Sequence, residues 1–366
     1  MHLTELSVVG WRNLKDTVID CDAPLVVLHG DNGQGKSNIL EAVHVLGTLK
    51  SFREPRTRRW IRHGEKAAGI AGRVDTPMGV RQMAWRWGDG VRRLQMDEAT
   101  VHELQSWFES IRAIVFCPED GSIVRGDPER RRRFMDRAAF TAHPGHLSAV
   151  TEYRRVLGHK RALLQHHRLD VEQLDAFDVS LARYGAAVIQ RRVSVVSELR
   201  DVFGRMHDEI AGQGVVDMRV RVTGIPDVEQ MDASEIETSL LEVIQEKRAQ
   251  EIERRQVLIG PHRDDLLLSI DGQVARNFAS QGQARSIVLG LKLSELDAAQ
   301  RRGDVPLFLL DDLTSELDAG RRGRLVEILR TLRGQVWVTT TDPSYLGNLS
   351  EVDHLNLHVN NGEITG

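Results

Sequence analysis

The hydrophobic pattern changes along the chain, and its first part is typical of strands. Residues 3–14 alternate between apolar and polar positions, and residues 25–30 form a short apolar run, so both are predicted strands. A glycine-rich turn covers residues 30–37, and the apolar positions of residues 38–49 recur at helical spacing. Weaker alternation in residues 69–96 predicts antiparallel hairpins, and residues 111–118 predict another strand.

The middle of the chain has a helical pattern. Between residues 128 and 256 apolar residues return every three or four positions among charged ones, with long helical blocks predicted at 174–210 and 233–255. A helix of about 35 residues is roughly 50 Å long. A short strand pair is expected at residues 216–225. We therefore predict a helical arm domain, residues 128–256, inserted into a head domain that combines residues 1–127 with residues 257–366.

Strand and helix patterns alternate again in the last part of the chain. Strand candidates at residues 266–274, 305–312 and 335–341 are accompanied by predicted helices at residues 283–301 and 320–332. Strands that alternate with helices form parallel sheets. The predicted fold class is therefore α/β, a mixed sheet with a parallel core and antiparallel hairpins, plus the helical arm.

Composition suggests a globular, cytoplasmic protein. The 366 residues, 41% hydrophobic and 28% charged, are enough for two or three domains. No apolar run reaches 18 residues and the first residues lack a signal-peptide pattern, so we expect neither export nor a membrane partner. Cys21 and Cys117 are far apart, which indicates neither a disulfide framework nor a zinc cluster.

Two basic segments stand out against a net charge of −4. Residues 50–66 carry seven Lys or Arg against two Glu, and residues 125–137 carry six Arg against three acidic residues. Each segment alone is typical of a solvated surface, but arginine forks also suit nucleic-acid phosphates. The residues that we expect to contact DNA are Arg53, Arg56, Arg58, Arg59, Arg62, Arg130 and Arg131.

The turn at residues 30–37 has the pattern G-x-x-x-x-G-K-[ST] between a predicted strand and a predicted helix. Backbone N–H groups of such a turn, together with the helix N-terminus, surround phosphate groups. Lys36 is expected to reach the β- and γ-phosphates, and Ser37 to bind Mg²⁺. The residues predicted to bind the nucleotide in this loop are Gly30, Asp31, Asn32, Gly33, Gln34, Gly35, Lys36 and Ser37.

A phosphate site of this kind needs a metal carboxylate at the end of a neighbouring strand. Four apolar residues lead into Asp311 and Asp312. Asp311 suits the Mg²⁺ ligand, and Asp312 is placed to orient or deprotonate the attacking water. The alternative interpretation of these two acids is a surface turn.

A second phosphate-facing helix start is predicted near residue 280. Ser280, Gly282 and Gln283 stand just before or within the start of a predicted helix, where backbone N–H groups attract anions. One chain has no second phosphate to place there, so we expect this site to bind the γ-phosphate held by another subunit, in an ATP-dependent homodimer. Residues 315–318 fit a loop that crosses the same interface. A simple N-capped helix is the alternative.

In order, the motifs GDNGQGKS, SQGQ, LLDD with SELD, and VTTTD resemble the ATP-binding-cassette ATPases. Within that group the chain resembles the RecF family of bacterial recombinational-repair ATPases, through WRNL, GQGKSNILEA, SFR, PED followed by IVRGDPERRRRFMD, GPHRDDL, SQGQARSIVLGLKLSE and LLDDLTSELD. These blocks cover essentially the whole chain. The resemblance implies a cassette-type ATPase head with the helical arm, and it assigns the phosphate loop, the metal carboxylate and the signature to Lys36, Ser37, Asp311, Ser280 and Gln283.

Three positions depart from the general cassette pattern. Asp312 stands where most cassettes have a catalytic glutamate, and Thr341 stands where many have a histidine that senses the γ-phosphate. Glu119 stands where relatives have a glutamine, and we group it with Ser37 and Asp311 as a metal ligand. A shorter acid reaches water less well and threonine carries no charge, so we expect slow hydrolysis. The RecF family shares these departures.

The resemblance implies an ATP-dependent DNA-binding protein that recognises duplex, gapped or junction DNA and acts with RecO and RecR to help load RecA, with links to DNA replication and SOS induction. Its cofactors would be ATP and Mg²⁺, and its DNA-stimulated ATPase would be weak. Three alternatives remain. The short arm argues against a structural chromosome ATPase of the SMC type, and the lack of a coupling surface argues against a transporter ATPase subunit. The lack of a nuclease domain argues against an overcoming-lysogenization-type nuclease. Spacing reveals no role for residues 260–265, GPHRDD, where an Arg263–Asp ion pair is as good a reading as a site.

Overall fold

The computed structural model describes residues 1–143, 145–166, 170–312, 317–347 and 352–366. These residues form two compact units: residues 1–120, 209–212 and 281–366 make the first, and residues 121–208 and 213–280 make the second. The predicted arm, residues 128–256, belongs to the second unit except for residues 209–212, and that unit extends further at both ends. Within the described ranges, no helix combines the length and the apolar character needed to cross a bilayer.

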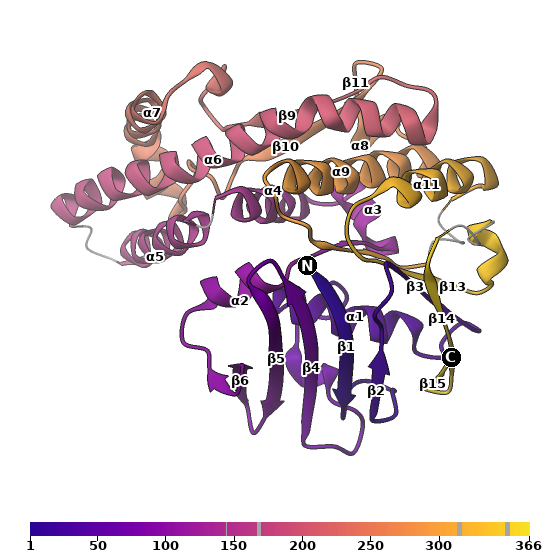
Figure 1. Ribbon diagram of the computed structural model, residues 1–366. Helices are drawn as coiled ribbons and strands as arrows, with labels where there is room; N and C mark the ends of the chain where they lie inside the picture. Colours follow the sequence, from indigo (N-terminus) through magenta and orange to yellow (C-terminus); the bar gives the residue numbers. More distant parts are fainter. Residues whose placement is uncertain (144, 167–169, 313–316, 348–351) are drawn as a thin grey trace. The chain divides into compact units, whose positions relative to one another are not determined.

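The first unit contains an antiparallel sheet of six strands in the order β2-β1-β4-β5-β6-β7 (Figure 1). Alternation places one face of this sheet in the core, where Leu6, Val8 and Trp85 are buried. The predicted hairpins of residues 69–96 correspond to its central strands. The strands are β1 (His2–Val9), β2 (Thr17–Asp20), β4 (Ala67–Thr76), β5 (Gly79–Gly88), β6 (Val91–Met96) and β7 (Ala99–Thr100).

The second sheet of this unit has the order β15-β14-β3-β13-β12-β8, and its five strands from β14 to β8 are parallel. The predicted mixed sheet with a parallel core is therefore confirmed. Parallel strands present their carboxyl ends at one edge, where ligands usually bind. The strands are β3 (Leu25–His29), β8 (Ala113–Phe116), β12 (Leu307–Leu310), β13 (Val336–Thr340), β14 (His354–Asn360) and β15 (Glu363–Thr365), the last antiparallel to β14.

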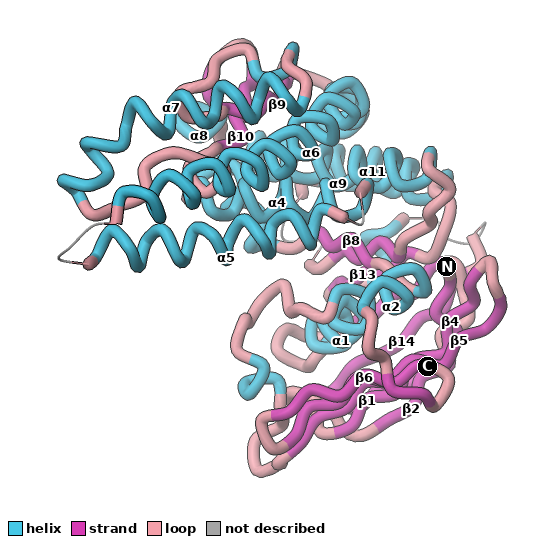
Figure 2. Tube along the Cα trace, turned by 90° about the vertical axis from the view of Figure 1, so that its left-hand side faces the viewer, coloured by secondary structure: helices cyan, strands magenta, loops and turns pink. Residues whose placement is uncertain are grey.

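Helix α1 (Lys36–Thr48) contacts strands of both sheets, and Figure 2 shows it between them. Ten of its 13 residues are buried, which explains why its apolar positions continue around the helix. The other helical segments among the described residues of this unit are η1 (Thr57–Trp60), α2 (Leu104–Ser110), η2 (Pro118–Asp120), α9 (Gln281–Arg301), α11 (Ala319–Thr331) and η4 (Pro343–Leu346).

The second unit is mainly helical and has a small sheet of its own, in the order β11-β10-β9. The expected strand pair at residues 216–225 is replaced by β9 alone, which pairs with β10 and explains why the unit extends beyond residue 256. Elements of the second unit are α3 (Gly121–Arg125), α4 (Pro128–Ala142), α5 (His146–Gln165), α6 (Val171–Ala211), β9 (Val216–Arg221), η3 (Val228–Gln230), α7 (Ala233–Arg254), β10 (Asp265–Ile270), β11 (Gln273–Val274) and α8 (Ala275–Phe278), with the last residues of α6 counted in the first unit.

The GPHRDD stretch, residues 260–265, binds together several helices of the second unit. The hydroxyl of Tyr153 on α5 is 2.5 Å from Nδ1 of His262. Arg192 on α6 donates to the carbonyl of Pro261 at 2.7 Å and lies 3.5 Å from the carboxylate of Asp264. The acidic residues of this stretch therefore face arginines of other elements, whereas the expected pairing involved its own Arg263. The stretch has a bracing role in this unit.

Candidate nucleotide-binding site

The glycine-rich turn of residues 30–37 connects β3 to α1 at the carboxyl edge of the parallel sheet. Gly30 has φ 137° and Gly35 has φ 120°, conformations that side chains rarely adopt. A Cβ on Gly30 would lie 2.4 Å from the carbonyl oxygen of Val359, and one on Gly35 would lie 2.8 Å from Cδ2 of Leu14. These two glycines are therefore required by close packing as well as by backbone conformation.

The ammonium group of Lys36 folds back over the same turn. Its Nζ donates to the carbonyl oxygens of Gly30, at 2.6 Å, and Asp31, at 2.7 Å. Lys36 is buried, and burial lowers its pKa, while the nearby carboxylates of Asp312 and Asp311 oppose that shift. A cation is thus held above the loop, where a phosphate chain needs one.

Ser37 and Asp311 lie together, as the sequence predicts. The Ser37 hydroxyl donates to Oδ1 of Asp311 at 2.7 Å, and the hydroxyl of Thr339 donates to the same oxygen at 2.8 Å. Burial raises the pKa of Asp311, while these two hydrogen bonds lower it. A hydroxyl next to a carboxylate is a donor set of hard oxygens that fits Mg²⁺.

Thr339 was not singled out from the sequence, although the run of threonines that ends β13 was a usable signal. Its hydroxyl also accepts a hydrogen bond from the backbone N–H of Asp312 at 2.7 Å. Asp312 adopts φ 53°, in the left-handed region that is uncommon for residues other than glycine. Thr339 therefore fixes both carboxylate residues at the end of β12.

Glu119 and Thr341 follow two other strands of the sheet at the same edge. Glu119 is exposed in η2, directly after β8, and its charge adds to the effect of burial in raising the pKa of Asp311. Thr341 is exposed immediately after β13. The structure thus brings Glu119 to the surroundings of the predicted metal carboxylate.

The outer part of the glycine-rich turn is exposed at Asp31, Asn32 and Gly33. Gln34 is held by the turn between β14 and β15: its Oε1 accepts a hydrogen bond from the backbone N–H of Asn361 at 2.7 Å, and its carbonyl accepts one at 2.9 Å from that of Gly362. The side chain and the carbonyl of Gln34 therefore both serve to hold the loop.

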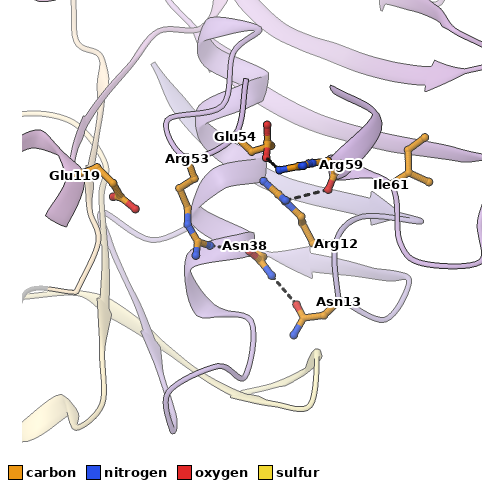
Figure 3. A pocket seen from close by; sticks show the side chains of 8 residues that line it. All are labelled: Arg12, Asn13, Asn38, Arg53, Glu54, Arg59, Ile61 and Glu119. Atoms are coloured by element: carbon orange, nitrogen blue, oxygen red, sulfur yellow. Dashed lines mark hydrogen bonds and ion pairs between the residues drawn. The ribbon is translucent and has the colours of Figure 1, made fainter. Parts of the chain in front are cut away.

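A cavity of about 510 Å³ lies beside the first turn of α1. Figure 3 shows Asn38 at its centre, donating to Oδ1 of Asn13 at 2.7 Å and accepting a hydrogen bond from Arg53 at 3.0 Å. Arg12, Asn13 and Asn38 were not predicted as site residues, because three separate segments build this cavity. The residues that line it are Arg12, Asn13, Asn38, Arg53, Glu54, Arg59, Ile61 and Glu119.

The first basic segment is largely open to solvent. Arg53, Arg56, Arg58 and Arg59 are exposed, and Arg59 is also paired with Glu54 at 2.9 Å. Arg62 is half-buried, and its guanidinium binds Asp16 and the carbonyl of Leu14. Four of the five predicted DNA contacts in this segment are therefore accessible.

The second basic segment corrects one prediction. Arg130 is exposed, but Arg131 is buried and binds both carboxylate oxygens of Asp265, at 2.6 and 3.0 Å. A buried guanidinium in a bidentate pair is not available to a DNA phosphate. Arg131 is consequently a structural residue that joins α4 to β10.

The predicted signature residues surround the start of α9, which begins at Gln281 directly after Ser280. Gly282 and Gln283 are half-buried in its first turn, and a Cβ on Gly282 would lie 2.7 Å from Nη1 of Arg321. In the predicted loop of residues 315–318, positions 315 and 316 lie outside the described residues, and Asp318 caps α11 by accepting from the backbone N–H of Arg321 at 2.9 Å. A guanidinium thus lies close to the predicted γ-phosphate acceptor.

Comparisons with known proteins find relatives over nearly the whole chain. A family model described as the RecF/RecN/SMC N terminal domain matches residues 2–363. A DNA replication and repair protein RecF from Geobacter sulfurreducens is 36% identical over 369 residues and all of both chains is covered. Another from Anaeromyxobacter sp. strain Fw109-5 is 38% identical over 347 residues, 93% of each chain.

Solved structures give the same result. A structure of the recombination mediator protein RecF with ATP, in the RecFOR pathway, is 25% identical with a TM-score of 0.89, covering 100% of this chain and 97% of its own. The Smc head domain from Pyrococcus furiosus is 14% identical with a TM-score of 0.59, covering 100% of this chain and 95% of its own, and so shares the fold alone.

Proposed function

The chain belongs to the RecF/RecN/SMC family and, within it, to the RecF proteins, and from that premise we propose that it is an ATP-dependent DNA-binding protein of recombinational repair. The observation that carries the proposal is the contact between Ser37 and Asp311, two residues 274 positions apart in sequence that form the predicted magnesium site. Lys36, held over the glycine-rich turn, completes a binding site for a triphosphate.

ATP would extend from the phosphate loop into the neighbouring cavity. Asn38 directly follows Ser37, so the cavity begins where the phosphate site ends. Guanidinium, amide and carboxylate groups around it provide partners for a ribose and a base, and Ile61 provides apolar contact. In this arrangement Lys36 and the backbone N–H groups of the turn would bind phosphates. Ser37, Asp311 and Glu119 would hold Mg²⁺, and Asp312 would orient the attacking water.

Two chains would share each nucleotide. Ser280, Gly282 and Gln283 would contact the γ-phosphate bound by the other subunit, because the N-terminus of α9 offers N–H groups to an anion. Sedimentation velocity with Mg²⁺ and a non-hydrolysable ATP analogue tests this: we expect a monomer without nucleotide and a dimer with it. Ser280→Arg should retain nucleotide binding and lose dimerisation. An unchanged dimerisation constant in that variant would refute the shared site.

The ATP-bound dimer would bind duplex or gapped DNA through the arginines of residues 53–62, and would act in the cytoplasm with RecO and RecR to help load RecA, with links to replication and SOS induction. If about five phosphates are neutralised, the logarithm of the affinity should fall against the logarithm of salt concentration with a slope of roughly −4.5. Fluorescence anisotropy with duplex, gapped and single-stranded DNA, with and without ATP, measures this. Dimerisation without DNA binding would favour the alternative, a structural chromosome ATPase of the SMC type.

Hydrolysis would act as a slow switch. The shorter side chain of Asp312 and the uncharged Thr341 both weaken the support for the attacking water, so we expect weak ATPase activity that DNA stimulates. Single-turnover hydrolysis with excess protein, measured with and without duplex DNA, tests this expectation. A fast, DNA-independent ATPase would contradict it.

A further inference from the structure

Glu41 is a fully buried acidic residue on α1, with 0% of its side chain exposed. Its carboxylate accepts two hydrogen bonds from the guanidinium of Arg12, from Nε at 2.8 Å and from Nη2 at 2.5 Å. The hydroxyl of Ser51 donates a third. Glu41 lies four residues after Ser37, about one turn further along the same side of α1. The same face of α1 thus carries Ser37, the predicted magnesium ligand, and the buried carboxylate of Glu41.

Both partners of Glu41 hold the basic segment of residues 53–62. The Ser51 oxygen accepts the backbone N–H groups of residues 53–54, at 2.9 and 2.8 Å. Nη1 of Arg12 donates to the carbonyl oxygen of Arg59 at 2.9 Å. The exposed arginines are therefore attached to α1 through Glu41 at the start and near the middle of the segment, in addition to the direct bond from Arg53 to Asn38.

The backbone conformation of Arg12 indicates that its position is fixed by its surroundings. Arg12 has φ 49°, a left-handed conformation that costs an arginine free energy and persists only where its surroundings impose it. Its backbone N–H donates to the carbonyl of Trp60 at 2.8 Å, and the indole N–H of the neighbouring Trp11 donates to the carbonyl of Asn38 at 2.9 Å. The chain around Arg12 is consequently fixed to α1 and to the basic segment at once.

We propose that Glu41 is a positioning residue that couples nucleotide binding at the phosphate loop to DNA binding by residues 53–62. The inference rests on the proposed function. Any movement of α1 when ligands fill its N-terminal turn moves the Glu41 carboxylate, and with it Ser51 and Arg12. Coupling between two binding sites is reciprocal, so DNA must raise nucleotide affinity by the same factor as the nucleotide raises DNA affinity.

The coupling factor is measured by titrating the full chain with a fluorescent ATP analogue and Mg²⁺, with and without a saturating 30-base-pair duplex, and then in the reverse order. For the unaltered protein we expect a factor on the order of 5- to 150-fold. Glu41→Gln keeps the shape and removes the charge, and should reduce the factor at least about threefold, with the affinity for nucleotide alone changed less. The link from Arg53 to Asn38 remains, so some coupling survives.

Ser51→Ala is the second variant, because it leaves the buried Arg12–Glu41 pair intact and cuts only one attachment. It should also reduce the coupling factor. Glu109→Gln, the same chemical change at an exposed position on α2 in the same unit, is the matched control and should leave the factor unchanged. Full coupling in both Glu41→Gln and Ser51→Ala overturns the inference alone. Failure of the unaltered protein to bind nucleotide or DNA overturns the proposed function, and this inference with it.

Discussion

The two arginine-rich segments of the chain look alike in sequence and differ in the structure. In residues 53–62 most arginines are exposed, and Arg53 and Arg59 line the cavity beside the first turn of α1, within one unit. In residues 130–133, Arg131 is buried against Asp265, and Arg132 donates to the carbonyl of Asp264 at 2.8 Å. The difference is the burial of the acidic partner, because Glu54 and Asp16 in the first case are not buried whereas Asp265 is. A run of arginines is a ligand surface only where the fold brings no buried carboxylate to it.

The largest effect is expected from Arg131→Met. Removing one partner of a buried ion pair leaves Asp265 without its bidentate partner, which typically costs about 3–5 kcal/mol. The remaining Arg221, 3.5 Å from Asp265 and largely exposed, favours the lower end of that range. Urea denaturation of the full chain measures the free energy of unfolding, and Asp265→Asn in the same chain should recover part of the loss. If the variant had normal stability but did not bind DNA, Arg131 would be a DNA-binding residue and its assigned structural role would be wrong.

Lys36→Met tests a buried cation that differs from Arg131. Among the contacts given above, its ammonium group is bonded only to backbone carbonyl oxygens. Because no ion pair is broken, stability should fall by only about 1 kcal/mol. Nucleotide affinity should fall at least about 100-fold, roughly 2.7 kcal/mol, since the cation facing the phosphates is lost. Isothermal titration calorimetry measures this. The control is Lys15→Met, which removes an exposed cation paired with Glu363. If Lys36→Met still bound the nucleotide tightly, the role of Lys36 in binding the phosphates would be wrong.

The pH dependence of the GPHRDD network provides an intermediate effect. Burial raises the pKa of Asp264 to about 7, although Arg192 and Arg132 oppose the shift; Asp136 adds to it. The folded state therefore holds a proton that the unfolded chain releases near pH 4, and stability is lost as pH rises from about 4 to about 7. The loss is at most about 1.4 kcal/mol per pH unit for one group.

Asp264→Asn removes that titration. The free energy of unfolding of the unaltered protein minus that of the variant should decrease as pH rises from 5 to 7, and should level off above it. Urea denaturation at four pH values gives this difference. A constant difference across the range would show that Asp264 is ionised in the folded protein, paired with Arg192 throughout.

The sequence was sufficient to predict the site where a motif is short and directly follows a strand of the parallel sheet. Residues 30–37 and Asp311 each follow an apolar strand, and parallel strands bring their carboxyl ends together, so the contact between Ser37 and Asp311 could be predicted. Arg131 could not be assigned correctly, because its partner lies 134 residues further along the chain. The second unit extends past residue 256, where the predicted arm ends, for a similar reason: β9 pairs with β10, which follows α7.

The cavity beside α1 could not be predicted from the sequence, because its walls come from segments that are far apart in the chain. Arg12 follows β1, Asn38 lies on α1 and Arg59 lies in η1, and only the packing of these elements creates the space. Glu41 escaped for another reason. On a helix in contact with two sheets, apolar spacing does not distinguish a buried carboxylate from an exposed one, and its role depends on where Arg12 and Ser51 arrive.

The smallest effect separates the two arginine segments directly. Arg58 is exposed in the first segment, whereas Arg133, exposed in the second, already pairs with Glu129. Arg58→Gln should reduce duplex affinity and make the salt slope shallower by about 0.9, the contribution of one phosphate contact. Arg133→Gln should change the slope little, and stability should stay within about 0.5 kcal/mol in both, because the substitutions are on the surface. Anisotropy titrations at four salt concentrations measure the slopes. Equal changes in the two variants would mean that both segments contact DNA, and that an exposed ion pair to Glu129 does not keep an arginine from a phosphate.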